Sequence, residues 1–215
     1  MKKFLILSFS ILLMSELFAQ QTSAAAIKQT FNTMMDAMRK GDSNLLRLVL
    51  ASSTLFTQFM QMQMVAEWQR AKIYTKAYLD AMPEDGYSFK PTPEIRSFAQ
   101  QMLHLSDANY VFATAASDIP NPVETAGAHN TNEKMVSPTK EATTKAVMDS
   151  YDWIITAIQN MTPDQMQQTT KFGKHENISR CALFDKAFEH QTHTRGQTTI
   201  YLRLKGVTPP AEQLF

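Results

Sequence analysis

The sequence predicts an all-α protein built on a four-helix bundle, with a helical extension before it. The first observation is composition, because only six of 215 residues are glycine, which disfavours turn-rich β architectures. The second is periodicity, because apolar residues recur at steps of three and four in four long stretches after residue 60. The third is a long segment rich in Pro, Asn, Thr and Ser between the middle two stretches. It predicts a crossover connection in place of simple up-and-down order.

Proline, glycine and capping residues set the expected helix limits, which are 65–82, 94–116, 139–161 and 177–206. The first helix ends before Pro83, and the second follows "FKPTP", where two prolines forbid helix just upstream. The third begins after Ser137-Pro138, and the last closes with Gly206. No strand pattern competes in this region. Only "LFTQFMQMQM" alternates, and it is equally readable as helix.

The first nineteen residues have the layout of a secretory signal. Two lysines, Lys2 and Lys3, precede an apolar run that is short for a membrane span and ends at Ala19. We therefore expect a signal peptide over 1–19, cleavage near Ala19–Gln20, export to the periplasm or the medium, and no stable membrane insertion afterwards. The single Cys181 cannot form an internal disulfide and is best interpreted as a small buried apolar residue.

Charge and methionine content exclude two classes of function. The net charge of +1 gives no electrostatic case for binding nucleic acid or a membrane surface. The fourteen methionines cluster in stretches such as "FMQMQM", without cysteine or histidine beside them. We interpret them as flexible core filler, since a thioether copper site would need such neighbours.

The segment "HQTHTRGQ" places two of the five histidines, His190 and His193, on one predicted helix. Strong helical metal pairs are spaced four apart, and the residue four after His190 is Thr194. Residues at steps of three and four form one expected stripe that is polar in its middle, namely Leu183, Ala187, His190, Thr194, Gln197, Tyr201 and Leu204. A buried polar centre needs partners, so we expect His190 to have one. His193 lies about 60° away, nearer the surface.

His104 on the second helix is the candidate partner of His190. Small residues lie on the same face of the predicted helix as His104. Asp107, one turn further on, could orient His104 or a bound water through a hydrogen bond. Neutral imidazoles suit zinc, nickel and similar metals. The competing interpretation is that His190 and His193 are polar side chains on the solvent-facing surface of the helix and bind no metal. His129 and His175 have no helical context and are expected to be solvent-exposed.

Two stretches carry a resemblance to a known family: "EWQRAKIYTKAYLDAMPEDGYSFKPTPEIRSFAQQMLHLSDANY" and "LFDKAFEHQTHTRGQTTIYLRLKGVTPP". Over residues 60–215 the chain resembles the DinB-like superfamily. The resemblance implies a four-helix bundle in down-up-up-down order with a three-histidine centre for zinc or nickel. It also implies a metal-dependent hydrolase or a thiol S-transferase, acting on a small-molecule substrate or a low-molecular-weight thiol.

Carried over by position, the family's first two ligands fall on His104 and His190, and the third falls on Thr194. A threonine hydroxyl is a poor zinc ligand, so the resemblance leaves the site incomplete unless His193, one position early, substitutes. The expected metal ligands are therefore His104, His190 and His193, with Asp107 and Thr194 around them. Arg195 is a candidate anchor for an anionic substrate group, and a salt bridge is the alternative.

Residues 22–58 have a different resemblance. "AAIKQTFNTMMDAMRKGDSNLLRLVLASSTLF" is similar to the opening helices of the SnoaL-like cone fold, which needs a curved sheet downstream. There is no room for that sheet before Trp68. We interpret 22–58 as a truncated remnant or a helical extension of the bundle, and as a candidate surface for a homodimer.

Three functions stay open from the sequence. The chain is an exported metal-dependent enzyme, a metal-free bundle that binds a ligand or partner, or a structural bundle without a site. The first two require the nitrogens of His104 and His190 to converge on one point, and the third allows them to diverge.

Overall fold

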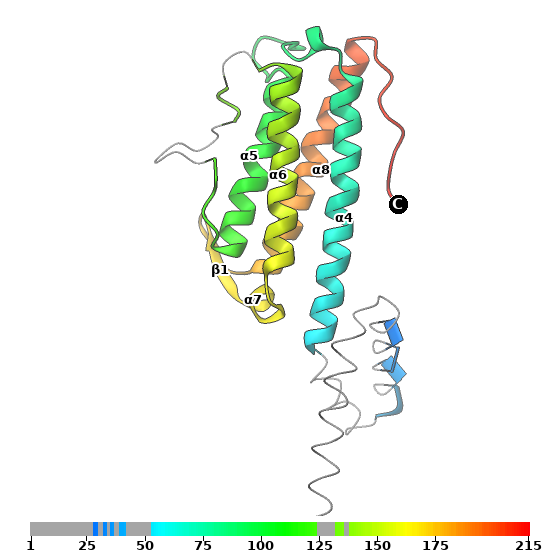
Figure 1. The fold of residues 1–215 in the computed structure, drawn as a ribbon, viewed down its shortest axis with the longest axis vertical. Helices are drawn as coiled ribbons and strands as arrows, with labels where there is room; N and C mark the ends of the chain where they lie inside the picture. Colours follow the sequence, from blue (N-terminus) through cyan, green and yellow to red (C-terminus); the bar gives the residue numbers. More distant parts are fainter. Residues whose placement is uncertain are drawn as a thin grey trace, which may run out of the picture. The chain divides into compact units, whose positions relative to one another are not determined.

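The computed structural model describes residues 53–123, 132–135 and 138–215, with the side chains from 57 onward, and scattered positions between 28 and 41. The chain divides into two compact units, Met1–Met60 and Gln61–Phe215. Within the described residues, the long helices are α4 (Ser53–Ala81), α5 (Phe98–Ser117), α6 (Lys140–Asn160) and α8 (Arg180–Leu204) (Figure 1). The predicted all-α bundle is confirmed.

The order of the helices follows from the long connection between α5 and α6. In Figure 1, α5 and α6 run in one direction, while α4 and α8 run in the other. Helix α5 packs against both α6 and α8. Two consecutive parallel helices need a connection that spans the length of the bundle, which explains the long segment between them.

Local capping sets where the helices begin. The Ser97 hydroxyl accepts a hydrogen bond from the Gln100 N–H (3.1 Å), and the Gln100 side chain accepts one from the Ser97 N–H (2.9 Å). This capping box starts α5 at Phe98, later than the predicted residue 94. The hydroxyls of Thr139 and Ser179 cap α6 and α8, each by accepting a hydrogen bond from the backbone N–H three residues on.

The core lies between the four long helices and combines aliphatic side chains with large aromatic ones. Trp68 is fully buried and meets the rings of Tyr151 and Phe188 edge-on, with centroids 5.8 and 5.4 Å away. Nearer the other end, the Tyr87 hydroxyl donates to the Leu79 carbonyl (2.7 Å), so its buried polar atom is satisfied. Edge-to-face packing of large rings holds the helices at fixed spacing.

A β-hairpin interrupts the predicted all-helical C-terminal region. The short helix α7 (Pro163–Gln167) leads into β1 (Thr169–Phe172), which pairs antiparallel with β2 (His175–Ser179). The expectation that no strand forms here, and that the last helix begins at 177, was wrong. Gly173 has φ +58° at the turn, and Phe172 stacks on Phe112 of α5 at 4.7 Å, so a non-local ring contact anchors the hairpin.

The "LFTQFMQMQM" segment, ambiguous from sequence, is helical and belongs to α4. Described positions before it are also helical, and Gly41 has φ +63°, which agrees with the predicted stop there. The expected signal segment 1–19, most of 22–58 and His129 lie outside the described residues. None of the described helices is long and apolar enough to cross a membrane.

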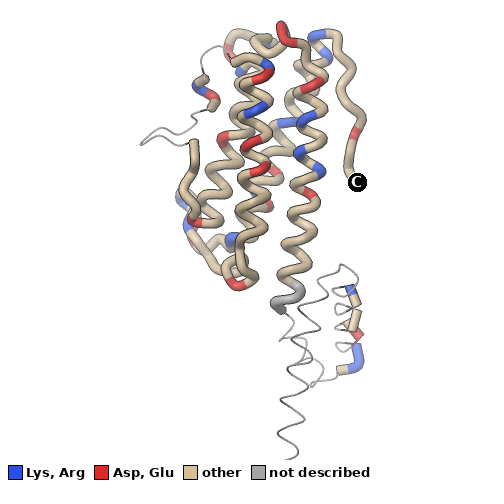
Figure 2. The backbone as a smooth tube through the Cα atoms, viewed as in Figure 1, with Lys and Arg blue, Asp and Glu red and all other residues tan. Residues whose placement is uncertain are grey.

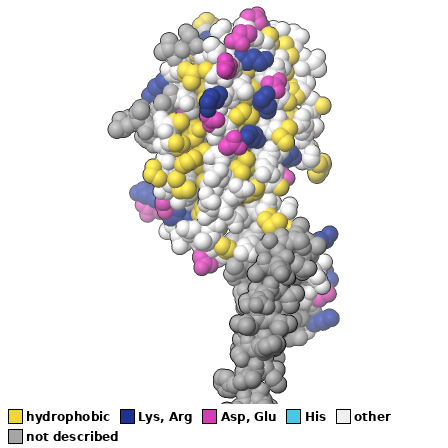
Figure 3. Space-filling model, in the orientation of Figure 1, with side chains coloured by type: hydrophobic (Ala, Val, Ile, Leu, Met, Phe, Trp, Pro, Cys, Tyr) yellow, Lys and Arg dark blue, Asp and Glu magenta, His cyan; other side chains and the backbone are white. Residues whose placement is uncertain are grey.

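Charged residues of both signs are interspersed along the helices (Figure 2). On the face shown in Figure 3, basic and acidic side chains neighbour one another between apolar ones. Several are joined as ion pairs, among them Lys72–Asp152 between α4 and α6 at 2.5 Å. This mixed surface agrees with the near-neutral net charge.

Candidate functional site

The structure brings His104 of α5 and His190 of α8 together. Their ring centroids are 5.1 Å apart, and the ring planes meet at 64°. Phe112 lies 6.2 Å from the His190 ring and closes one side. Two imidazoles from facing helices in a bundle interior form the kind of arrangement that holds metals in helical bundles.

His190 has an unusual environment for a titratable side chain. Its Nδ1 is buried and has no hydrogen-bond partner among the described residues, which differs from the expectation that the ring is paired. Burial, followed by the neighbouring His104, His193 and Arg96, lowers the pKa of His190 from 6.5 to about 4. The imidazole is therefore neutral near pH 7, which is the protonation state that ligates metals.

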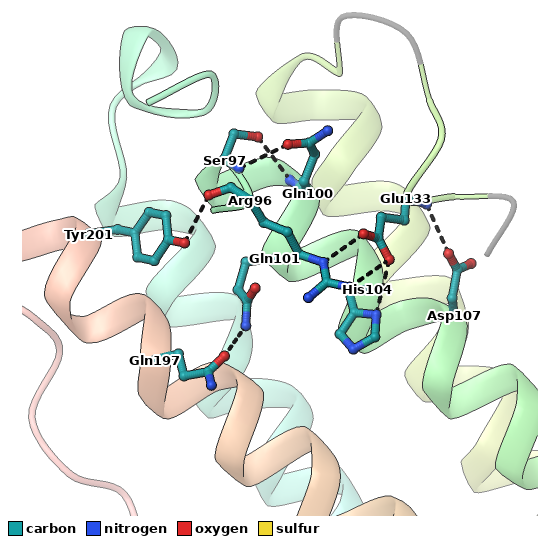
Figure 4. Close-up of polar contacts among 9 residues, drawn as sticks. All are labelled: Arg96, Ser97, Gln100, Gln101, His104, Asp107, Glu133, Gln197 and Tyr201. Carbon is teal, nitrogen blue, oxygen red and sulfur yellow. Dashed lines mark hydrogen bonds and ion pairs between the residues drawn. The ribbon is translucent and has the colours of Figure 1, made fainter. Parts of the chain in front are cut away.

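A carboxylate that the sequence did not reveal faces His104. Glu133 Oε2 lies 3.0 Å from His104 Nδ1, and Arg96 Nε donates to Glu133 Oε1 at 2.6 Å (Figure 4). Glu133 belongs to the long connection between α5 and α6, where no periodic pattern exists. Only the fold brings it beside the site, so no local signal in the sequence could have found it.

Asp107 does not hydrogen-bond to His104 and instead holds the connection that carries Glu133. Its two carboxylate oxygens accept the backbone N–H groups of Asn132 (3.1 Å) and Glu133 (2.9 Å). The Asn132 side chain also donates to Ser106 Oγ at 3.0 Å. Burial raises the pKa of Asp107, and the two backbone hydrogen bonds oppose that rise.

His193 lies on the exposed side of α8, away from the pair. The Gln197 amide donates to its Nε2 at 2.9 Å, and Gln197 also accepts a hydrogen bond from Gln101. In the part of the chain that the structure describes, no group of three or more His, Cys, Asp or Glu side chains is placed to hold a metal ion. The three-histidine set expected from sequence is therefore present as two facing rings with His193 at the flank.

Thr194 and Arg195 are both buried. The Arg195 guanidinium donates to Gln191 Oε1 (3.0 Å) and Thr75 Oγ1 (3.3 Å), and it lies 4.3 Å from the centroid of the Tyr74 ring. The Tyr151 hydroxyl bonds to the same two oxygen-bearing side chains, at 2.8 Å from Gln191 and 2.7 Å from Thr75. We call Thr75, Tyr151, Gln191 and Arg195 the polar core network. Arg195 is part of that network, and its role as a substrate anchor stays an untested prediction.

A cavity of about 730 Å³ opens next to the site. It is lined by Pro91, Glu94, Ile95, Arg96, Gln101, Glu133, Gln197, Ile200 and Tyr201. The Tyr201 hydroxyl donates to the Arg96 carbonyl at 2.9 Å and holds one wall in place (Figure 4). Glu133 belongs both to this wall and to the His104 contact, so the cavity and the histidines share a side chain.

The lowered pKa of His190 predicts how stability depends on pH in the metal-free protein. The unfolded chain protonates this ring near pH 6.5, while the folded protein does so only near pH 4. The unfolded state therefore binds more protons between these values, and the free energy of unfolding falls as the pH is lowered from 6.5 to 4. Urea denaturation at pH 7, 5.5 and 4.5 measures the effect. His190→Gln should show a shallower dependence, and an unchanged slope in that variant would contradict the assignment.

Comparisons with known proteins identify the family of the chain. The model of the DinB family matches residues 52–214. No curated protein matches the chain. A DinB-like protein from Bacillus cereus has a similar structure, at 18% identity and a TM-score of 0.58 over 69% of this chain and 95% of that one. A DinB-like protein from Bacillus subtilis shows 18% identity and a TM-score of 0.53, over 71% of this chain and 96% of that one.

A conserved protein from Enterococcus faecalis has 16% identity and a TM-score of 0.51, over 66% of this chain and 95% of its own. At these identities the structural likenesses show the fold alone. The family model, in contrast, spans α4, α5, α6 and α8 as well as the facing histidines. The chain belongs to the DinB family.

Proposed function

We propose that this protein is a metal-dependent hydrolase or thiol S-transferase with a two-histidine centre. One observation carries the proposal: a buried His190 Nδ1 without a partner lies on a ring beside His104. An unsatisfied buried polar atom costs roughly 1–3 kcal/mol, so a ligand that satisfies it is favoured. A neutral imidazole is a good ligand for zinc or nickel and a poor group to leave unpaired.

The donor set fits a divalent cation held by two protein nitrogens. His104 and His190 would hold it, and with Nδ1 of His104 facing Glu133, the Nε2 of that ring stays available. A bound zinc or nickel ion supplies Lewis acidity, which lowers the pKa of water or of a thiol. Two protein ligands bind the metal ion more weakly than three histidines do, and they leave more coordination positions for the substrate.

The cavity beside Glu133 suits a small molecule with both apolar and polar parts. Ile95, Ile200 and the Tyr201 ring provide the apolar wall. Gln101, Gln197 and Arg96 add polar side chains to the same lining. Such convergence of a few polar groups on an apolar wall is typical of small-molecule sites. We assign substrate binding to this cavity.

Export is part of the proposal and is supported by the lysine-then-apolar pattern of residues 1–19. Recovery from the periplasm or the medium of a chain with the mass expected for cleavage near Ala19 tests it. The predicted homodimer surface on residues 22–58 stays a prediction.

A second function, metal-free binding of a ligand or partner, is favoured by one specific observation. Thr194 stands where the family pattern has its third histidine, and His193 is held by Gln197 at the surface. In that case, His190 Nδ1 accepts a hydrogen bond from an organic ligand or donates one to it, and no metal is bound.

His190→Ala separates these functions. We expect the purified wild-type protein to bind Zn²⁺ in a titration against a chromophoric chelator, and the variant to bind at least about tenfold more weakly, because one of two imidazoles is gone. His175→Ala is the matched control, since His175 is exposed on β2. His193→Ala tests whether the flanking His193 ring contributes to Zn²⁺ binding. Wild-type protein that binds no more Zn²⁺ than the His190→Ala variant would favour the metal-free function.

A further inference from the structure

We propose that Glu133 is the positioning residue of the site, which fixes the tautomer and the orientation of His104. Its consequence for metal affinity rests on the proposed function. The orientation of the ring, in contrast, is a property of the metal-free protein and is measured separately.

The contact geometry selects one tautomer. Glu133 Oε2 lies 3.0 Å from His104 Nδ1, and an ionised carboxylate can only accept hydrogen bonds. When the His104 ring is neutral, its proton therefore lies on Nδ1, and its Nε2 is unprotonated. Both side chains are largely shielded, with 26% of the His104 side chain and 19% of the Glu133 side chain exposed, so water competes weakly for this bond.

Arg96 holds Glu133 from the other side. Its Nε donates to Oε1 at 2.6 Å, and its Nη2 lies 3.4 Å from Oε2. With both oxygens engaged, rotation of the carboxylate relative to the imidazole is restricted. The Arg96 carbonyl is itself bound by the Tyr201 hydroxyl, so the chain of contacts ends on α8 (Figure 4).

The backbone that carries Glu133 is docked on the same helix as its target. Asp107 lies three residues after His104 on α5 and accepts the N–H groups of residues 132 and 133 with its two oxygens. The Asn132 amide adds a third bond, to Ser106 Oγ. Glu133, 29 positions away in sequence, is thereby placed against His104, although Asp107 itself makes no hydrogen bond to the imidazole.

This arrangement matches a general property of histidine ligands. A carboxylate on the second ring nitrogen fixes the tautomer and raises the basicity of the ligating nitrogen, and its loss typically lowers metal affinity about 10- to 100-fold. We expect Glu133→Ala to lower Zn²⁺ affinity by about that factor. Glu133→Gln keeps an acceptor oxygen but loses the charge, and should fall between wild type and Glu133→Ala.

The test uses the full-length protein without metal. Long-range ¹H–¹⁵N correlation spectra of the histidine rings report which nitrogen carries the proton. We expect the Nδ1–H tautomer of His104 in wild type, and a mixture or the Nε2–H form in Glu133→Ala. Asp107→Asn, which leaves one acceptor oxygen for two backbone N–H groups, should shift His104 in the same direction. Glu176→Gln, which breaks an exposed ion pair with Lys171, is the matched control.

The outcomes separate the two proposals. A changed tautomer in Glu133→Ala supports the positioning role whether or not the protein binds Zn²⁺, and failure of wild type to bind Zn²⁺ would then count only against the metal function. An unchanged tautomer in a folded Glu133→Ala variant overturns the positioning role. An amide ¹H–¹⁵N spectrum that matches wild type away from residues 96–107 and 132–135 shows that the variant is folded.

Discussion

Thr194→His is expected to raise the Zn²⁺ affinity of the protein by roughly 100-fold or more, through a third imidazole in place of a hydroxyl that binds zinc poorly. Thr194 lies one turn after His190 on α8, and residues four apart share a helix face. The substituted ring would join the existing pair, whose centroids are 5.1 Å apart. The competing cost is overpacking, because Thr194 is only 1% exposed, and such a cost is typically about 1–3 kcal/mol.

Thr198→His is the matched control for this prediction. Thr198 is also buried on α8 and lies one turn further from His190 than Thr194 does. A histidine at this position therefore carries a similar packing cost but adds no third ring beside His104 and His190. Competition with a chromophoric chelator measures affinity, elemental analysis measures stoichiometry, and thermal unfolding monitors the fold. Equal affinities of the two folded variants for Zn²⁺ would contradict a site centred on His104 and His190.

Tyr151→Ala should lower the free energy of unfolding by about 3–5 kcal/mol, the range measured for large cavities left by aromatic truncation. The Tyr151 side chain is fully buried, meets the Trp68 ring edge-on and bonds to Thr75 and Gln191 through its hydroxyl. Truncation therefore removes core packing and leaves two members of the polar core network short of a partner.

Tyr151→Phe separates these two contributions, because it removes only the hydroxyl. We expect a loss of about 1–3 kcal/mol, since a buried hydrogen-bonding group is left unsatisfied while the ring still fills the core. Urea denaturation at pH 7 gives both values. If the two variants lose the same free energy, the hydrogen bonds and not the ring packing dominate at this position.

Helix limits were predictable where the determinants are local. The predicted helix 139–161 is α6, Lys140–Asn160, because Thr139 caps it and Pro163 follows it. The hairpin after α7 was not predictable in this way, because its position depends on Phe172 packing against Phe112, far away in the sequence. Similarly, the capping box at Ser97 takes precedence over the helical periodicity that begins at Glu94.

The sequence predicted the two facing histidines of the candidate site, but it did not predict Glu133 or the polar core network. Helical spacing placed His104 and His190 on inward faces, but the expected stripe on α8 was partly out of phase, since Gln197 is exposed while Gln191 and Arg195 are buried. Pattern arguments treat polar residues as exposed unless a partner is known. The partners here, Thr75 and Tyr151, lie on other helices and become visible only in the fold.

The polar core network has a consequence for how this lineage can change. Its hydroxyl, amide and guanidinium groups pair with one another inside the bundle, independently of what occupies the space between His104 and His190. The stability that this network contributes is therefore separate from the proposed metal centre. A substitution at position 194 therefore leaves these hydrogen bonds in place, and its cost to folding is the packing cost of the new side chain itself.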